Sequence, residues 1–190
     1  MKTPYLSLLI VLFSFFGNAQ TIVKEYYDNG NLKSIETQVN GKANGPAKIY
    51  YESGELQLST NFQTVEIDGK SIKLPVGETI GYFKDGTIGG QGSFSIADGK
   101  SIKEGQHKMY YENGNLKSLD SYKNGIKDGE KKEFYENGKK KLVASYSNGK
   151  ETGLKLSYYQ NGNLESQYEN LPADQLSTYK EFFRNGELKK

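Results

Sequence analysis

The chain lacks cysteine and tryptophan and carries a single histidine among its 190 residues. Without cysteine it can form neither a disulfide framework nor a thiolate metal site. Its 25 basic and 23 acidic residues leave a net charge of +2, which provides no general attraction to nucleic acid. No apolar run reaches the roughly 20 residues that a membrane-spanning helix needs. These deficits exclude a polytopic membrane protein and a disulfide scaffold.

Glycine and tyrosine are abundant instead, with 22 and 15 copies, and aromatic residues make up 13% of the chain. Glycine supplies the positive φ angles of tight turns, and aromatic residues favour strands. The composition therefore predicts many short strands joined by tight turns. The length suits one ordinary domain or one array of repeats.

The beginning of the chain differs from the rest. A basic start, an apolar stretch over residues 6–16 and small residues before the cut predict a secretory signal peptide at residues 1–19. Cleavage between Ala19 and Gln20 leaves residues 20–190 as the exported repeat domain, and the alternative is a buried N-terminal strand or helix. Because no cysteine lies at the cut, we expect no lipid anchor and a periplasmic or extracellular product.

An internal repeat runs through the remaining sequence. Seven aromatic pairs are each followed, after two further residues, by a glycine, and these glycines lie 24, 32, 28, 24, 24 and 24 residues apart. A fixed period of this length indicates a repeat architecture. A second pair of glycines, such as Gly125 and Gly129, recurs in the same frame. The predicted turn glycines are Gly30, Gly54, Gly86, Gly114, Gly138, Gly162 and Gly186.

Each unit is predicted to be a β-hairpin. Asn113-Gly114 is the signal for a two-residue type I′ turn, and Asn124-Gly125 closes the next turn. This register places Tyr111 opposite Leu116 on one face, with the first aromatic of each pair on the other. Period-two counting adds to the face of Leu116 an aromatic stripe eight residues after the turn glycine, namely Phe62, Phe94, Tyr122 and Tyr146.

Three units depart from the pattern. The extra residues of the two long units predict longer loops at 63–81 and 87–105, and the glycine-rich segment 86–92 is interpreted as a distorted third hairpin. In the fifth copy Lys140 stands where others have leucine, and Leu142 is expected to replace it on the same face.

Two strands alone cannot bury a useful face, so the hairpins must stack against one another. The predicted fold is all-β, an elongated antiparallel meander of about seven stacked 24-residue β-hairpin repeats that forms a solenoid-like ribbon.

The segment Tyr-Tyr-Glu-Asn-Gly-Asn-Leu-Lys-Ser within residues 110–129, repeated over 134–153 and 158–165, resembles the MORN-type repeat, specifically the bacterial variant of YwqK-type antitoxin-like proteins. The resemblance implies an array of β-hairpins that associates with proteins, with membrane or lipid contact proposed for some members. The antitoxin label implies binding and neutralising a toxin protein. The connection around Leu171-Pro172 lacks the glycine pair and is interpreted as an atypical C-terminal cap.

No catalytic constellation is recognisable. His107 has no nucleophile motif near it. Acidic residues such as Glu52, Glu112 and Glu136, which recur one position beyond the aromatic pair, are explained by turn solvation. The segment 86–92 lacks the Lys-Ser/Thr ending of a phosphate-binding loop. We therefore expect no enzymatic activity, no catalytic residue, no metal ligand and no cofactor.

The aromatic doublets are the strongest functional candidates, because tyrosine is enriched in protein interfaces. The sequence predicts an exported, non-enzymatic scaffold that associates with a protein partner through an aromatic β-face. The alternatives are a cell-envelope glycan-binding module, an antitoxin or immunity protein, and contact with a membrane surface; nucleic acid is not expected. The candidate residues are Tyr111, Tyr135 and Tyr159, or their opposite-face neighbours Tyr110, Phe134 and Tyr158.

Overall fold

The computed structural model describes residues 11–13, 19–170 and 177–189. Most of the predicted signal peptide and the Leu171-Pro172 cap lie outside these residues. The chain divides into two compact units, residues 1–102 and 103–190, which are described separately below.

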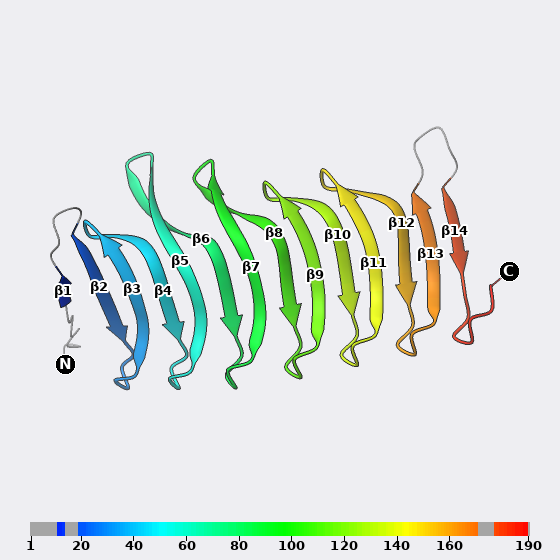
Figure 1. Ribbon diagram of the computed structural model, residues 1–190, viewed down its shortest axis with the longest axis horizontal. Helices are drawn as coiled ribbons and strands as arrows, with labels where there is room; N and C mark the ends of the chain where they lie inside the picture. Colours follow the sequence, from blue (N-terminus) through cyan, green and yellow to red (C-terminus); the bar gives the residue numbers. More distant parts are fainter. Residues whose placement is uncertain (1–10, 14–18, 171–176, 190) are drawn as a thin grey trace. The chain divides into compact units, whose positions relative to one another are not determined.

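All regular secondary structure in the described part of the chain is β-strand (Figure 1). Unit 1 contains β1 (Val11–Phe13), β2 (Gln20–Tyr26), β3 (Leu32–Val39), β4 (Lys42–Tyr50), β5 (Leu56–Ile67), β6 (Lys70–Tyr82) and β7 (Ile88–Ala97). Strand β8 (Lys100–Tyr110) begins in unit 1 and continues into unit 2. Unit 2 further contains β9 (Leu116–Lys123), β10 (Ile126–Phe134), β11 (Lys140–Ser147), β12 (Lys150–Tyr158), β13 (Leu164–Asn170) and β14 (Thr178–Glu181).

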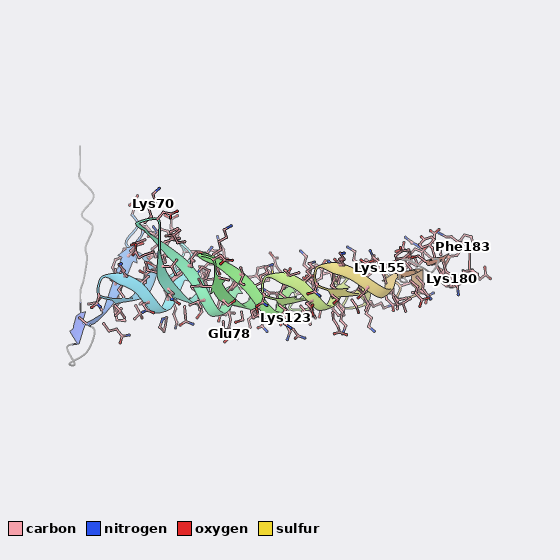
Figure 2. The ribbon with its side chains drawn as sticks, turned by 90° about the horizontal axis from the view of Figure 1, so that it is seen from above. Lys70, Glu78, Lys123, Lys155, Lys180 and Phe183 are labelled. Carbon is pink, nitrogen blue, oxygen red and sulfur yellow. The ribbon has the colours of Figure 1, made fainter. Side chains whose placement is uncertain are left out.

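Within each unit the strands form an antiparallel meander, because each strand pairs with its neighbours in the sequence. All seven predicted turn glycines have positive φ, between 79° and 107°. The all-β hairpin repeat predicted from the sequence is therefore confirmed. In each unit, side chains project from both sides of the sheet (Figure 2).

Few side chains are fully buried in such a sheet. Among the described residues, the buried side chains are those of Ala43, Ala47, Leu119, Ala144, Thr37 and Thr60. Five of these six side chains are small. Dispersion contacts and apolar burial are correspondingly limited. Within each unit, contacts between neighbouring hairpins must therefore supply much of the stability.

The doublet turns differ from the predicted type I′ turn. The Tyr111 N–H donates to the Asn115 carbonyl over 2.9 Å, and the Gly114 N–H donates to the Tyr111 carbonyl over 2.9 Å. These bonds close a three-residue loop in which Gly114, with φ of +82°, takes the left-handed conformation. Tyr110, and not Tyr111, is thus paired with Leu116.

The turns at the other ends of the hairpins do follow the prediction. Lys123 pairs with Ile126, and both residues of the intervening Asn124-Gly125 have positive φ, 51° and 78°. This is the type I′ geometry, whose twist matches that of the flanking strands.

A bulge after each doublet turn changes the predicted faces. Tyr110 pairs with Leu116 but Met109 pairs with Ser118, so one extra residue, Lys117, lies in β9. After the bulge, side chains alternate between the two faces again, but one residue out of step. Each side chain after the bulge therefore lies on the face opposite to the one expected from an unbroken alternation. Tyr122 therefore lies on the side opposite Leu116, contrary to the prediction. The same bulge separates Lys140 from Leu142, so Leu142 does not replace the missing leucine on its own face.

We name the two sides of each sheet by their residues. The leucine face carries the first aromatic of each doublet and the leucine paired with it, for example Tyr110 with Leu116 and Tyr158 with Leu164. The stripe face is the other side, and it carries Phe62 and Phe94 in unit 1 and Tyr122 and Tyr146 in unit 2.

The predicted long loops at 63–81 and 87–105 are strands instead. The extra residues lengthen β5 and β6, and β7 and β8, and the turns shrink to the pairs Asp68-Gly69 and Asp98-Gly99. Residues added equally to both strands extend the ladder without changing the alternation of faces. The β5–β6 hairpin projects beyond β4 in Figure 1.

The glycine-rich segment 86–92 also forms an ordinary hairpin. The Phe83 N–H donates to the Thr87 carbonyl over 2.8 Å, and the Gly86 N–H donates to the Phe83 carbonyl over 3.0 Å. These are the same two bonds that close the other doublet turns, so the third hairpin is not distorted at its turn.

The second glycine of each pair forms a further bulge. Between β9 and β10 the pairing jumps from Tyr122 with Lys127 to Asp120 with Lys131, and Gly129 lies inside this bulge with a φ of +107°. A Cβ at Gly129 would lie 3.0 Å from the Ser121 Cβ. Both the backbone angle and the close approach therefore require glycine.

The substitution Gly129→Ala should destabilise unit 2 more than Gly105→Ala. Both place alanine at positive φ, which costs about 1–2 kcal/mol, but a Cβ at Gly105 meets nothing within 4 Å. The additional close contact at Gly129 should cost about 1–3 kcal/mol more. Urea unfolding followed by tyrosine fluorescence measures the difference, and equal losses of stability would show that the contact with Ser121 is relieved without cost.

Candidate functional site

The second tyrosines of the doublets form a hydrogen-bonded series along each unit, which we call the tyrosine ladder. Each hydroxyl donates to the backbone carbonyl of the first aromatic in the next doublet. The side chain of one hairpin thereby satisfies the backbone of the next. The bonds are Tyr27 to Tyr50 (2.7 Å) and Tyr51 to Tyr82 (2.8 Å) in unit 1, and Tyr111 to Phe134 (2.8 Å), Tyr135 to Tyr158 (2.7 Å) and Tyr159 to Phe182 (2.8 Å) in unit 2.

The rings of the ladder tyrosines are also engaged. Tyr111 is half-buried, and the Lys117 Nζ from its own hairpin lies 5.4 Å from the ring centroid. The Arg184 guanidinium lies 5.6 Å from the ring of Tyr159. Three of the six candidate residues, Tyr111, Tyr135 and Tyr159, thus use their hydroxyls within the repeat array.

Phe83 occupies a ladder position in unit 1 but has no hydroxyl to donate. Its ring packs instead against the backbone of Gly89, where an added Cβ would lie 3.3 Å from two ring atoms. At Phe83, ring packing on a glycine thus takes the place of the ladder hydrogen bond.

The turn asparagines form a second series of bonds that the sequence pattern had not revealed. Asn113 and Asn115 both donate through Nδ2 to the Glu136 carbonyl, over 3.0 and 2.8 Å. Asn113 also accepts the Asn115 N–H through Oδ1. The recurrence of Asn-Gly-Asn in three of the seven units, at residues 29–31, 113–115 and 161–163, was the available signal. The interpretation of Asn113-Gly114 as a turn signal assigned a role to Asn113 but none to Asn115.

The other three candidates lie on the leucine face. Tyr110 pairs with Leu116, Phe134 with Lys140, and Tyr158 with Leu164, and these three aromatic residues are half-buried. Tyr158 takes part in the ladder only through its carbonyl. Leu154, on the same face, is 42% exposed.

The stripe face of unit 2 is more polar. The Lys103 Nζ lies 4.8 Å from the ring centroid of Tyr122, and the Lys127 Nζ lies 5.4 Å from that of Tyr146. Lys127 also pairs with Asp120 over 2.8 Å. Tyrosine rings and paired charges thus alternate along this side of the unit.

An ion pair between Lys131 and Glu133, 2.8 Å long, lies on the same face. The hydrogen bond from the Lys131 ammonium lowers the pKa of the Glu133 carboxyl, and the same bond raises the pKa of Lys131. Both groups therefore stay charged at neutral pH, and their attraction is partly offset by their exposure to water.

The ring of His107 stands edge-on to that of Tyr122, with centroids 5.2 Å apart. No group of three or more metal-binding side chains occurs among the residues that the structure describes. Within the same residues, no helix has the length and apolar character required to cross a membrane.

Comparison with known proteins identifies the repeat class. The family model described as a MORN repeat variant matches residues 20–40, 43–64, 103–124, 127–148 and 151–169. No curated protein matches the chain.

The solved structures that match the chain include three with low sequence identity and low TM-scores. A crystal structure of TcdB2-TccC3-Cdc42 is 12% identical with a TM-score of 0.27, and the match covers 86% of this chain but 11% of that one. A crystal structure of TcdB2-TccC3-TEV is 11% identical with a TM-score of 0.22, over 90% and 12% of the two chains. A porin-like protein from Bacteroides uniformis is 10% identical with a TM-score of 0.17, over 99% and 95%. The chain thus spans about a tenth of the length of the first two.

The substitution Tyr135→Phe should destabilise unit 2 by about 1 kcal/mol, because it removes one ladder hydrogen bond and leaves the ring in place. Tyr158→Phe is the matched control, since it removes a hydroxyl outside the ladder, and it should change stability by less than about 0.5 kcal/mol. Chemical unfolding of both variants measures the two effects. Equal losses in the two variants would contradict a stabilising role for the ladder.

Proposed function

Because the chain belongs to the MORN repeat variant family, we propose that it is a non-enzymatic repeat scaffold that binds a protein partner through the leucine face. A single-layer sheet leaves both of its faces accessible, and a repeat array presents the same side chains at regular spacing along its length. Such a surface suits an extended partner.

The observation that carries the proposal is the different use of the two aromatics in each doublet. All six residues are half-buried. The second tyrosines donate hydrogen bonds to the neighbouring hairpin, whereas Tyr110, Phe134 and Tyr158 lie on the leucine face, which also carries the 42% exposed Leu154. Aromatic and leucine side chains that keep part of their surface in water gain free energy when a partner covers them. The leucine face is therefore the side from which a partner gains more apolar contact.

Export belongs to the same proposal. The basic and apolar pattern of residues 1–19 supports removal of this segment and a periplasmic or extracellular location. In the full chain, β1 pairs with β2 through Val11 and Ile22. Cleavage after Ala19 would leave this outer edge of β2 without its partner strand.

The substitution Leu154→Glu should weaken partner capture at least tenfold, because it places a charge in an apolar contact. Met109→Glu is the matched control. Met109 is 52% exposed. It precedes Tyr110 in β8 and therefore lies on the stripe face, so its substitution should leave capture unchanged. The measurement is quantitative pull-down from cell-envelope extract with the exported protein and both variants, each checked by circular dichroism.

Retention of one stoichiometric protein by the wild type and Met109→Glu, and its loss with Leu154→Glu, would support the proposal. Retention of cell-wall glycan alone would instead favour a glycan-binding module. If the captured protein proved to be a toxin whose activity is blocked, the scaffold would act as an antitoxin. Equal capture by the two variants would contradict binding through the leucine face.

A further inference from the structure

A hollow of about 140 Å³ lies on the stripe face of unit 1. Its apolar walls are Val23, Ala47, Ile49 and Phe62, contributed by strands β2, β4 and β5. Register places these side chains on one side of the sheet, because Val23 pairs with Glu36, Glu36 with Ala47, and Gly45 with Phe62. The hollow therefore lies on the opposite side from the leucine face.

An ion pair spans the hollow. The Lys73 Nζ on β6 lies 2.5 Å from the Glu36 Oε2 on β3, although three strand spacings, about 14 Å in a flat sheet, separate these strands. Side chains of this length meet over that separation only if the sheet curves around the stripe face. The Lys73 ammonium also lies 4.7 Å from the ring centroid of Phe62, which is one of the apolar walls of the hollow.

The two partners of this ion pair are held very differently. The Glu36 side chain is 14% exposed, and its Oε1 accepts a 3.0 Å hydrogen bond from the Gln38 amide. The Lys73 side chain is 49% exposed and comes from the lengthened β5–β6 hairpin. The carboxylate is thus a fixed part of the hollow, whereas the ammonium is an occupant that water can solvate at little cost.

We propose that this hollow is a binding site for the guanidinium group of a partner's arginine side chain, which displaces Lys73 from Glu36. A planar guanidinium can lie on the Phe62 ring while its N–H groups donate to the carboxylate. The ammonium of lysine meets both groups as a point charge and matches this pair of surfaces less well. The site uses the stripe face and does not depend on partner binding through the leucine face.

Methylguanidinium is the probe that tests the proposal, in NMR titrations of the full chain. Saturable shifts should appear at Ala47 and Ile49, and methylammonium should bind more weakly. Lys73→Ala removes the internal competitor, so the apparent affinity for methylguanidinium should rise about two- to fivefold. Glu36→Gln should abolish the shifts.

Lys70→Ala is the matched control, because Lys70 is an exposed lysine at the tip of the same hairpin, outside the hollow (Figure 2). It should titrate like the wild type. The proposal is overturned if no variant shows saturable shifts at Ala47 and Ile49, or if Lys73→Ala binds no more tightly than Lys70→Ala. Binding that persists in Glu36→Gln, or equal affinity for methylammonium, would also overturn it.

Discussion

A sheet one layer thick has no second layer against which to bury its side chains, and this constraint governs each unit of the molecule. The buried side chains among the described residues are mainly alanine and threonine, so apolar burial contributes less than in a two-layer domain. Hydrogen bonds between neighbouring hairpins therefore carry more of the stability. The ladder tyrosine meets this need because one side chain spans from its own doublet to the backbone of the next. This contact joins each doublet to the next, and the doublets recur with the 24-residue period of the sequence.

The sequence predicted the repeats, the seven turn glycines and the antiparallel hairpins, because these follow from local chemistry that recurs in phase. It failed on the doublet turn. Asn113-Gly114 fits a two-residue type I′ loop and also a three-residue loop with glycine in the left-handed position. The choice depends on which backbone groups pair, and the bond from Tyr111 to Asn115 settles it. The sequence also did not reveal the bulge after each doublet turn, which places Tyr122 and Leu142 on the face opposite to the predicted one.

The candidate site was predictable in composition but not in role. All six aromatic candidates came from the doublet pattern, yet the pattern treats both members of a doublet alike. Only the three-dimensional arrangement separates Tyr135, which donates its hydroxyl to the neighbouring hairpin, from Phe134, which pairs with Lys140 on the leucine face. The contact between Glu36 and Lys73 was beyond sequence reasoning, since it joins residues 37 positions apart through the curvature of the sheet.

Exchange of the tyrosine hydroxyl protons with water, measured by NMR at low temperature, tests the central claim directly. The account predicts slow exchange for the hydroxyls of Tyr27, Tyr51, Tyr111, Tyr135 and Tyr159, which donate to backbone carbonyls of the next hairpin. The hydroxyls of Tyr110 and Tyr158 should exchange faster. Exchange of the ladder hydroxyls as fast as that of Tyr158 would contradict the account.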